Sequence, residues 1–131
     1  MTYRAQRIIP HPEAFSRLRP RQPRRQSGDH LKFIRSLPCV ICLTRNNVQA
    51  AHIRMASIVH GKRQTGIGEK PSDRFVTCLC PTHHEEQHRG NEAEFWKRYG
   101  INPFELALTL YAHSGDEDTA ETVVRMARPR T

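Results

Sequence analysis

Two pairs of metal-ligand side chains with the same spacing constrain this chain more than any other feature. Cys39 and Cys42 are separated by two residues, and so are Cys80 and His83. This spacing forms a tight turn whose ligand atoms converge on one ion. Three thiolates and one imidazole complete a tetrahedral site, so the sequence predicts a structural zinc that joins two distant segments.

The cysteines leave other interpretations open. Small buried thiols, or a redox pair at Cys39 and Cys42, would show the same spacing. The second pair supplies the missing half of a zinc site, which favours the metal. Nothing marks the chain as secreted, which argues against a disulfide. Cys78 is left over from the set, and we expect it to pack in the core.

Three further histidines, His52, His84 and His88, form a second candidate cluster. His84 and His88 are four residues apart, which on a helix places both imidazoles on one face, able to share an ion. The alternative is a pair of solvated helix residues. The neighbouring zinc ligands and the third histidine favour the ligand interpretation. A closed site beside an open one indicates a structural zinc supporting a catalytic metal.

The helix expected to carry this pair runs from Thr82 to about Arg89. Thr82 is its expected N-cap, and Glu85 and Glu86 are expected in its first turn, where negative charge is favourable. Gly90 is expected to end it.

His52 lies in an expected strand over residues 48–53, and a partner strand is expected over residues 75–79. The intervening loop, residues 54–74, is long for a hairpin, and long loops in compact domains are commonly functional. The expected order is therefore strand, long loop, strand and helix, with a histidine on the first strand and a histidine pair on the helix.

These residues resemble the HNH endonucleases, whose fold is a ββα-metal core. The resemblance covers about residues 29–100 and is closest to the phage recombination-enhancement branch, whose nucleases depend on a recombinase. It is carried by four motifs, Cys39–Cys42, Ala51–Arg54, Gly66–Asp73 and Leu79–His88.

The resemblance implies a role for each residue of the second cluster. By motif position, His52 is the general base that activates a water for attack on phosphorus. His84 and His88 bind one divalent cation, which stabilises the developing charge and the leaving 3′ oxygen. Asp73 falls near the family's middle asparagine and is given a supporting catalytic role. Arg54 is expected on the same strand face as the base, where it would contact the scissile phosphate.

One position departs from the family pattern. Many members carry an acidic residue or a second histidine directly before the base, and that side chain binds the metal. Here the position is Ala51. Imidazole ligands suit zinc, nickel or manganese, whereas magnesium is abundant and often takes oxygens from the substrate, so Mg, Mn and Ni all remain candidates for the catalytic cation.

The charge of the chain is consistent with a DNA partner. Its 131 residues carry a formal net charge of +8, the electrostatic signature of a protein that binds a polyanion. Residues 1–28 contain seven arginines, four prolines and a single acid, Glu13. Such a segment cannot bury enough apolar surface to fold, so we expect a disordered basic arm. The alternative is an arm that binds nothing specific.

The remainder, residues 29–131, is expected to form one α+β HNH nuclease domain with a structural zinc and additional C-terminal helices. A short helix is expected over 29–37. Asn91 and Asn102 are expected to cap two later helices, and a final amphipathic helix is expected over 116–127. No segment is long and apolar enough to span a membrane, and the branch implies the cytoplasm of a bacterial host.

The leading functional hypothesis is a metal-dependent DNA endonuclease, with a recombinase filament as a candidate partner. The alternative is a zinc-stabilised module that binds DNA or assists recombination without catalysis. A ribonuclease is a third option, because nothing in the sequence distinguishes the sugar. Oligomeric state is left open. The basic side chains of the long loop are expected to contact nucleic acid, namely Arg54, Lys62, Arg63, Lys70 and Arg74.

Overall fold

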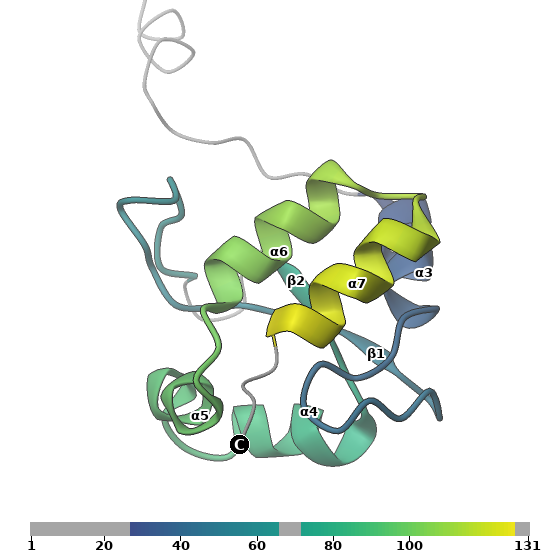
Figure 1. The fold of residues 1–131 in the computed structure, drawn as a ribbon. Helices are drawn as coiled ribbons and strands as arrows, with labels where there is room; N and C mark the ends of the chain where they lie inside the picture. Colours follow the sequence, from purple (N-terminus) through teal and green to yellow (C-terminus); the bar gives the residue numbers. More distant parts are fainter. Residues whose placement is uncertain (1–26, 66–71, 128–131) are drawn as a thin grey trace, which may run out of the picture.

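The computed structural model describes residues 27–65 and 72–127 (Figure 1). Most of the expected arm, residues 1–26, and Lys70 lie outside the described residues. The described part is α+β, as predicted. Its elements are α3 (Gly28–Arg35), β1 (Gln49–His52), β2 (Val76–Leu79), α4 (Pro81–His88), α5 (Glu92–Tyr99), α6 (Pro103–Ala112) and α7 (Glu117–Ala127).

The two strands form an antiparallel pair in which His52 lies opposite Val76. The pairing continues beyond the strand ends, because the Ile53 N–H donates to the Phe75 carbonyl at 2.9 Å. Cys80 alone separates β2 from α4. The predicted order of strand, long connection, strand and helix is therefore confirmed.

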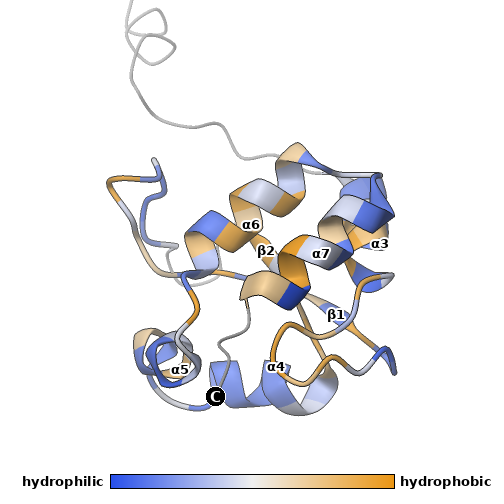
Figure 2. Cartoon of the chain, in the orientation of Figure 1, coloured by the Kyte–Doolittle hydropathy of each residue, from blue (hydrophilic) through white to orange (hydrophobic). Residues whose placement is uncertain are grey.

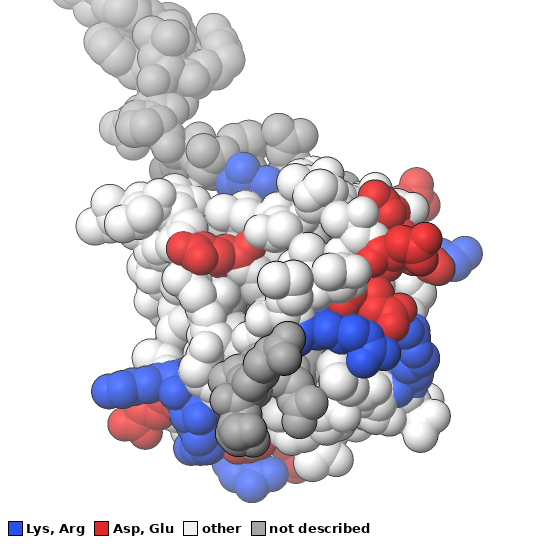
Figure 3. All heavy atoms as spheres, viewed as in Figure 1, with Lys and Arg blue, Asp and Glu red and all other residues white. Residues whose placement is uncertain are grey.

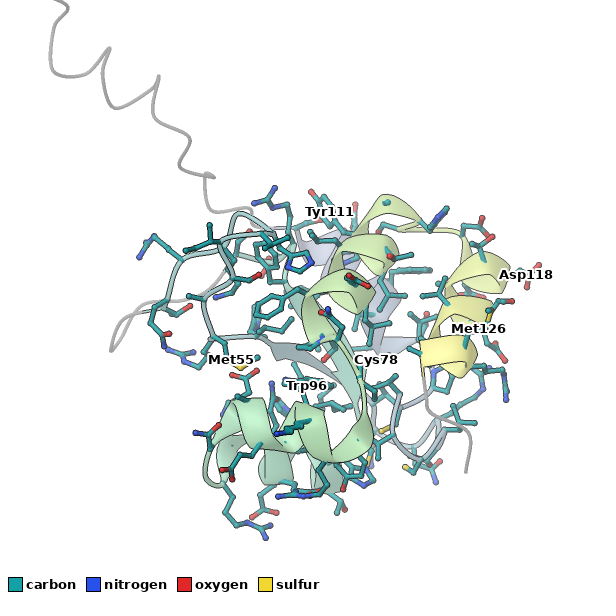
Figure 4. All side chains as sticks on the ribbon, turned by 60° about the vertical axis from the view of Figure 1, so that its left-hand side comes forward. Met55, Cys78, Trp96, Tyr111, Asp118 and Met126 are labelled. Atoms are coloured by element: carbon teal, nitrogen blue, oxygen red, sulfur yellow. The ribbon has the colours of Figure 1, made fainter. Side chains whose placement is uncertain are left out.

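The core lies between this sheet and the helices that pack on it. Helices α3 and α6 contact the strands, and α7 packs against α6 (Figure 1). All four residues of β2 are buried. In Figure 4 Cys78 lies in the interior, whereas Asp118 and Met126 lie at the outer side of α7. The largest fully buried side chains include Trp96, Phe75, Phe95, Ile34 and Leu37.

Helix α4 differs from its neighbours because it has almost no apolar side chains. Its sequence is Pro-Thr-His-His-Glu-Glu-Gln-His, and Figure 2 shows it coloured as hydrophilic along most of its length. The only buried residue in it is Gln87. Apolar burial, which usually fixes a helix to a domain, therefore contributes little here. Polar contacts and the candidate metal ligands have to hold α4 in place.

The start of α4 corrects one prediction. The helix begins at Pro81, and Cys80 occupies the N-cap position in place of the predicted Thr82. Proline is favoured at the first helical position because its φ is already helical and its missing N–H would have no partner there. As a result Glu85 and Glu86 lie beyond the first turn, which contains no acidic residue.

Helix α3 also begins earlier than predicted. We expected it over 29–37, but it starts at Gly28 and ends at Arg35. The Ser27 hydroxyl accepts a hydrogen bond from the His30 N–H at 3.2 Å, which makes Ser27 the N-cap. Ser27 and Gly28, which the sequence assigned to the arm, thus belong to the folded part.

The predicted caps of the later helices are confirmed. The Asn91 and Asn102 side chains accept from backbone N–H groups at the starts of α5 and α6, and Pro103 occupies the first position of α6. Gly100 ends α5 with a φ of 67°, a left-handed conformation that favours glycine. The Asp116 carboxylate accepts from a backbone N–H in the first turn of α7. No helix in the described ranges is long and apolar enough to cross a membrane.

Candidate metal centre and adjoining histidine site

The four predicted zinc ligands lie together in the structure. The Sγ atoms of Cys39, Cys42 and Cys80 and a ring nitrogen of His83 all lie within 4.8 Å of one another. Cys42 Sγ is 3.8 Å from Cys80 Sγ, and His83 Nδ1 is 3.2 Å from Cys80 Sγ and 3.7 Å from Cys39 Sγ. A tetrahedral zinc with ordinary bond lengths separates two sulfurs by about 3.8 Å and a sulfur from a nitrogen by about 3.6 Å. The donor set and its spacing thus fit a zinc-like ion.

Two local structures bring these ligands together. The segment around Cys39 folds back on itself, because the Leu43 N–H donates to the Cys39 carbonyl at 2.8 Å and Leu43 adopts a positive φ of 64°. The Ile41 N–H also points at Cys39 Sγ, at 3.4 Å. The other two ligands, Cys80 and His83, come from the start of α4. The cluster therefore joins the turn after α3 to the polar helix.

The pKa values of the Cys39 and Cys80 thiols are shifted in opposite directions. Burial raises the pKa of the Cys39 thiol to about 11. Burial also acts to raise the pKa of Cys80, but hydrogen bonds from the His83 backbone N–H and from the Cys42 and Cys39 thiols outweigh it, and the pKa of Cys80 falls below its usual value. Cys39 therefore stays protonated at neutral pH unless a metal ion displaces its proton.

Cys78 lies apart from this set. It is fully buried in the hydrophobic core, and burial raises the pKa of its thiol to about 12. It is not among the residues whose ligand atoms converge. The prediction that Cys78 packs in the core is confirmed.

His52 and Asp73, which the sequence placed 21 residues apart, form a direct contact. His52 Nε2 lies 2.8 Å from Asp73 Oδ1. The Asp73 carboxylate is buried, and its other oxygen, Oδ2, accepts a hydrogen bond from the Ser27 N–H at 2.8 Å. The carboxylate is thus fixed from two sides and in turn orients the His52 ring.

His84 and His88 form the predicted pair on one face of α4. Their Nε2 atoms are 3.2 Å apart, and two imidazoles that bind one ion at ordinary distances have nitrogens about 3.0–3.4 Å apart. Gln49 Oε1 lies 2.6 Å from His84 Nδ1 and would accept its proton, which leaves the lone pair on Nε2. Burial, followed by the charges of His88 and His52, lowers the pKa of His84, which favours the neutral, metal-binding form.

A network of hydrogen bonds connects the helix that carries this pair to the strand that carries His52. Gln87 Nε2 donates to the His52 carbonyl at 3.3 Å and to Glu92 Oε2 at 2.8 Å. Glu92 also accepts from the Arg54 N–H at 3.2 Å and from Trp96 Nε1–H at 3.1 Å. We call this the Gln87–Glu92 network. It holds the backbone directly after His52, on both sides of Ile53, against α4 and α5.

Sequence reasoning missed Gln49, Gln87 and Glu92. Gln49 lies opposite Leu79 in the sheet, next to the start of α4, so a correct register would have suggested it. Gln87 is the one residue of α4 that is buried. Glutamine is mostly found on the surface, so its residue type gave no sign of this burial. No signal in the sequence marked Glu92.

The predicted nucleic-acid contacts have mixed outcomes. Arg54 lies beyond the end of β1, beside a shallow open hollow, and Arg63 is exposed. Lys62 is only 7% exposed, and its ammonium group donates to the Arg63 carbonyl at 3.0 Å, a geometry that does not favour the predicted contact. The Arg74 guanidinium lies over a buried phenylalanine ring at 5.1 Å. Lys70 lies outside the described residues. On the face drawn in Figure 3, described basic and acidic groups lie near one another.

The chain belongs to the family described as "Protein of unknown function (DUF968)", whose pattern matches residues 7–114. This match covers the metal-ligand cluster, the histidine cluster and both strands. A search of the curated proteins found no match to the chain. A search of the solved structures also found none.

Replacement of one cluster ligand tests the metal assignment. We expect the wild-type protein to bind one zinc per chain and Cys42→Ala to bind none. Because zinc binding contributes about 10 kcal/mol or more in small zinc-folded peptides, Cys42→Ala should lose several kcal/mol of stability. Metal analysis after dialysis and urea unfolding give the two measurements.

Cys78→Ala is the matched control for this test. It removes a buried thiol outside the cluster, so it should keep the zinc and lose only about 1 kcal/mol. Equal zinc content in all three proteins would contradict the assignment of Cys42 as a ligand.

The Gln87–Glu92 network gives a second prediction. Glu92→Ala removes the acceptor of three hydrogen bonds, so we expect the free energy of unfolding to fall by about 2 kcal/mol. Glu94→Ala, an exposed change in the same helical turn, should have little effect. Unfolding in urea, followed by the fluorescence of the single tryptophan Trp96, measures both. Equal stabilities of the two variants would show that the network contributes little.

Proposed function

We propose that this protein is a metal-dependent endonuclease of the HNH type, which hydrolyses phosphodiester bonds in DNA. The observation that carries the proposal is the pairing of His52 with a buried carboxylate, Asp73, beside a second pair of imidazoles, His84 and His88, suited to one ion. A general base held by a carboxylate and a cation site next to it are the parts that phosphodiester hydrolysis needs.

The arrangement of the elements supports the same proposal. An antiparallel strand pair leads directly into a helix, the candidate base ends the first strand, and the imidazole pair lies on the helix. This order corresponds to the ββα-metal core of the HNH endonucleases, which the motifs resemble. The Cys39, Cys42, Cys80 and His83 cluster then acts as the structural site that holds the helix.

In the proposed mechanism the Nε2–H of His52 donates to Asp73, which fixes the tautomer with the lone pair on Nδ1. Nδ1 accepts a proton from water as the oxygen attacks phosphorus. The bond from phosphorus to the 3′ oxygen breaks, and that oxygen takes a proton from solvent. Arg54, beside the hollow at the end of β1, would bind the scissile phosphate.

A divalent cation bound to His84 and His88 would supply positive charge beside the phosphorus and the leaving oxygen. The position before the base gives no further ligand, because Ala51 is a small, fully buried residue of the core. The rest of the coordination would come from water and substrate oxygens, as is common for magnesium and manganese. We propose Mg, Mn or Ni for this site.

The proposed substrate is DNA, with a recombinase filament as an accessory partner and a phage or prophage origin. The net charge of +8 supports a polyanionic substrate. A zinc-stabilised module that binds DNA without cutting it is the alternative. The sequence and geometry of the imidazole pair favour the enzyme, because a binding module does not require an open cation site.

A cleavage assay tests the proposal. Plasmid, single-stranded DNA and RNA are incubated with the protein and Mg²⁺, Mn²⁺ or Ni²⁺, with and without a recombinase filament. We expect the wild type to cut DNA, and His52→Ala to cut it about 10²–10⁴-fold more slowly because it lacks the general base. Both proteins should retain their zinc.

His113→Ala is the control, because it removes an exposed imidazole from the end of α6. It should cut as the wild type does. No cutting by any protein under any condition, with salt-sensitive DNA binding intact, would replace the nuclease with the binding module. Cutting of RNA alone would make it a ribonuclease.

The role of Gln49 gives a further prediction. Loss of the partner that orients His84 should weaken divalent-ion binding at the pair by about 10–100-fold. Titration calorimetry of zinc-loaded protein with Mn²⁺ or Ni²⁺ would compare Gln49→Ala with Gln64→Ala, an exposed glutamine of the loop after β1. Equal affinities would exclude this positioning role.

A further inference from the structure

Two aliphatic side chains are presented to solvent at the tip of a tight turn between the strands. Ile58 is 96% exposed and Val59 is 89% exposed. The other large hydrophobic side chain exposed in the described residues, Met126, is 73% exposed and lies on α7. In Figure 2 the outer end of the loop that follows β1 is coloured as hydrophobic, and it extends away from the body of the molecule.

The turn is closed by its own backbone. The Ser57 N–H donates to the Lys62 carbonyl at 2.8 Å, and the Lys62 N–H donates to the Ser57 carbonyl at 2.9 Å. Gly61 adopts a positive φ of 69°, which a tight turn of this kind requires. These reciprocal bonds fix the backbone on both sides of Ile58 and Val59.

Side chains also anchor the turn to the domain. The His60 ring stacks on Phe104 of α6 with centroids 5.3 Å apart, and its Nδ1 lies 2.7 Å from the Ser57 hydroxyl. Its Nε2 is 4.0 Å from a Glu105 carboxylate oxygen. The buried Lys62 ammonium binds the carbonyl that follows it. These contacts hold the turn against the domain, and within residues 57–62 the side chains of Ile58 and Val59 are the ones left exposed. Exposed aliphatic side chains lower solubility, so their exposure calls for another explanation.

The charge around this tip suits a nucleic acid. The described loop, residues 53–65, contains Arg54, Lys62 and Arg63 and no acidic residue. Among the described residues, two acids of other elements contact the loop: Glu92 of α5 accepts from the Arg54 N–H, and Glu105 of α6 faces His60. Lys62 is buried, so Arg54 and Arg63 are the basic groups that flank the apolar tip on the surface. Basic groups beside an apolar tip are the combination used by proteins that bind phosphates and insert a side chain between bases.

The tip is also close in the chain to the proposed base. Ile58 lies six positions after His52, so the two lie within about 22 Å of each other even if the chain is fully extended. Successive bases of DNA rise by about 3.4 Å. A base step contacted by the tip would thus lie within about six base pairs of the bond that is cut.

We propose that Ile58 and Val59 form a wedge that enters between stacked base pairs of duplex DNA near the cleavage site and distorts the duplex there. The inference rests on the proposed nuclease function and adds its substrate, a duplex that the protein itself unstacks. Both side chains are branched at Cβ and therefore stiff, so little rotamer freedom is lost on insertion. Two residues are too few for the core of a stable protein interface, which argues against a protein partner at this tip.

The test uses the double variant Ile58→Ser and Val59→Ser, which leaves the anchoring residues unchanged. We expect it to cut an intact duplex about tenfold or more slowly than the wild type, because unstacking a base step costs a few kcal/mol. Duplexes with a central mismatch or bulge are already unstacked, so on them the variant should approach the wild-type rate. Met126→Ser, which removes an exposed aliphatic side chain far along the chain, should behave as the wild type on every substrate.

A second measurement does not depend on cleavage. In a His52→Ala background, duplexes carrying 2-aminopurine at successive positions should become more fluorescent on binding, and the double variant should abolish the increase. Such an increase without any cutting by the wild-type protein would support the wedge and overturn the nuclease.

The remaining outcomes overturn the wedge. If the double variant cuts intact and mismatched duplexes in the same proportion as the wild type, the wedge is wrong and the nuclease stands. If the wild type neither binds nor cuts DNA, both proposals fail. If the double variant loses only self-association, or only binding to anionic phospholipid vesicles, the tip serves a second copy of the chain or a membrane surface.

Discussion

The position of helix α4 depends on four converging candidate metal ligands, two of which lie at its start. The helix has hardly any apolar side chains, and Gln87 is the only residue in it that is buried. Ordinary helices are held by an apolar face, and this one is held at one end by Cys80 and His83, which meet the turn at Cys39 and Cys42. A bound metal ion would make strong and directional contacts, so this cluster could fix a helix whose remaining faces are polar.

A second set of contacts fixes the other end of the helix relative to the strand pair. The Gln87–Glu92 network bonds to the backbone directly after His52, at the His52 carbonyl and the Arg54 N–H, and Asp73 holds the imidazole itself. Helix α5 adds a further tie, because the Tyr99 hydroxyl donates to Glu86 at 2.8 Å. The candidate base and the imidazole pair therefore sit on two elements whose separation is set by polar contacts, which act over short distances and tolerate little displacement.

Several features could be predicted because they depend on near neighbours in the chain. Asn91 and Asn102 cap helices through bonds to residues two or three positions ahead. The start of α4 was predicted wrongly at Thr82 because Pro81, which is favoured at the first helical position, moves the N-cap back to Cys80. Lys62 looked like a surface cation, but the fold of its loop buries it.

The sequence by itself determined the candidate ligand set of the cluster, the order of strands and helix, and the identity of the paired histidines, because residue type and short spacing specify these. Only the tertiary structure decided which distant groups meet: Asp73 with His52, Gln49 with His84, and Gln87 and Glu92 with the backbone that follows His52. It also decided that Ile58 and Val59 stay outside the core. The reason is physical, since hydrogen-bond partners far apart in the chain are chosen by strand register and packing, which no local pattern encodes.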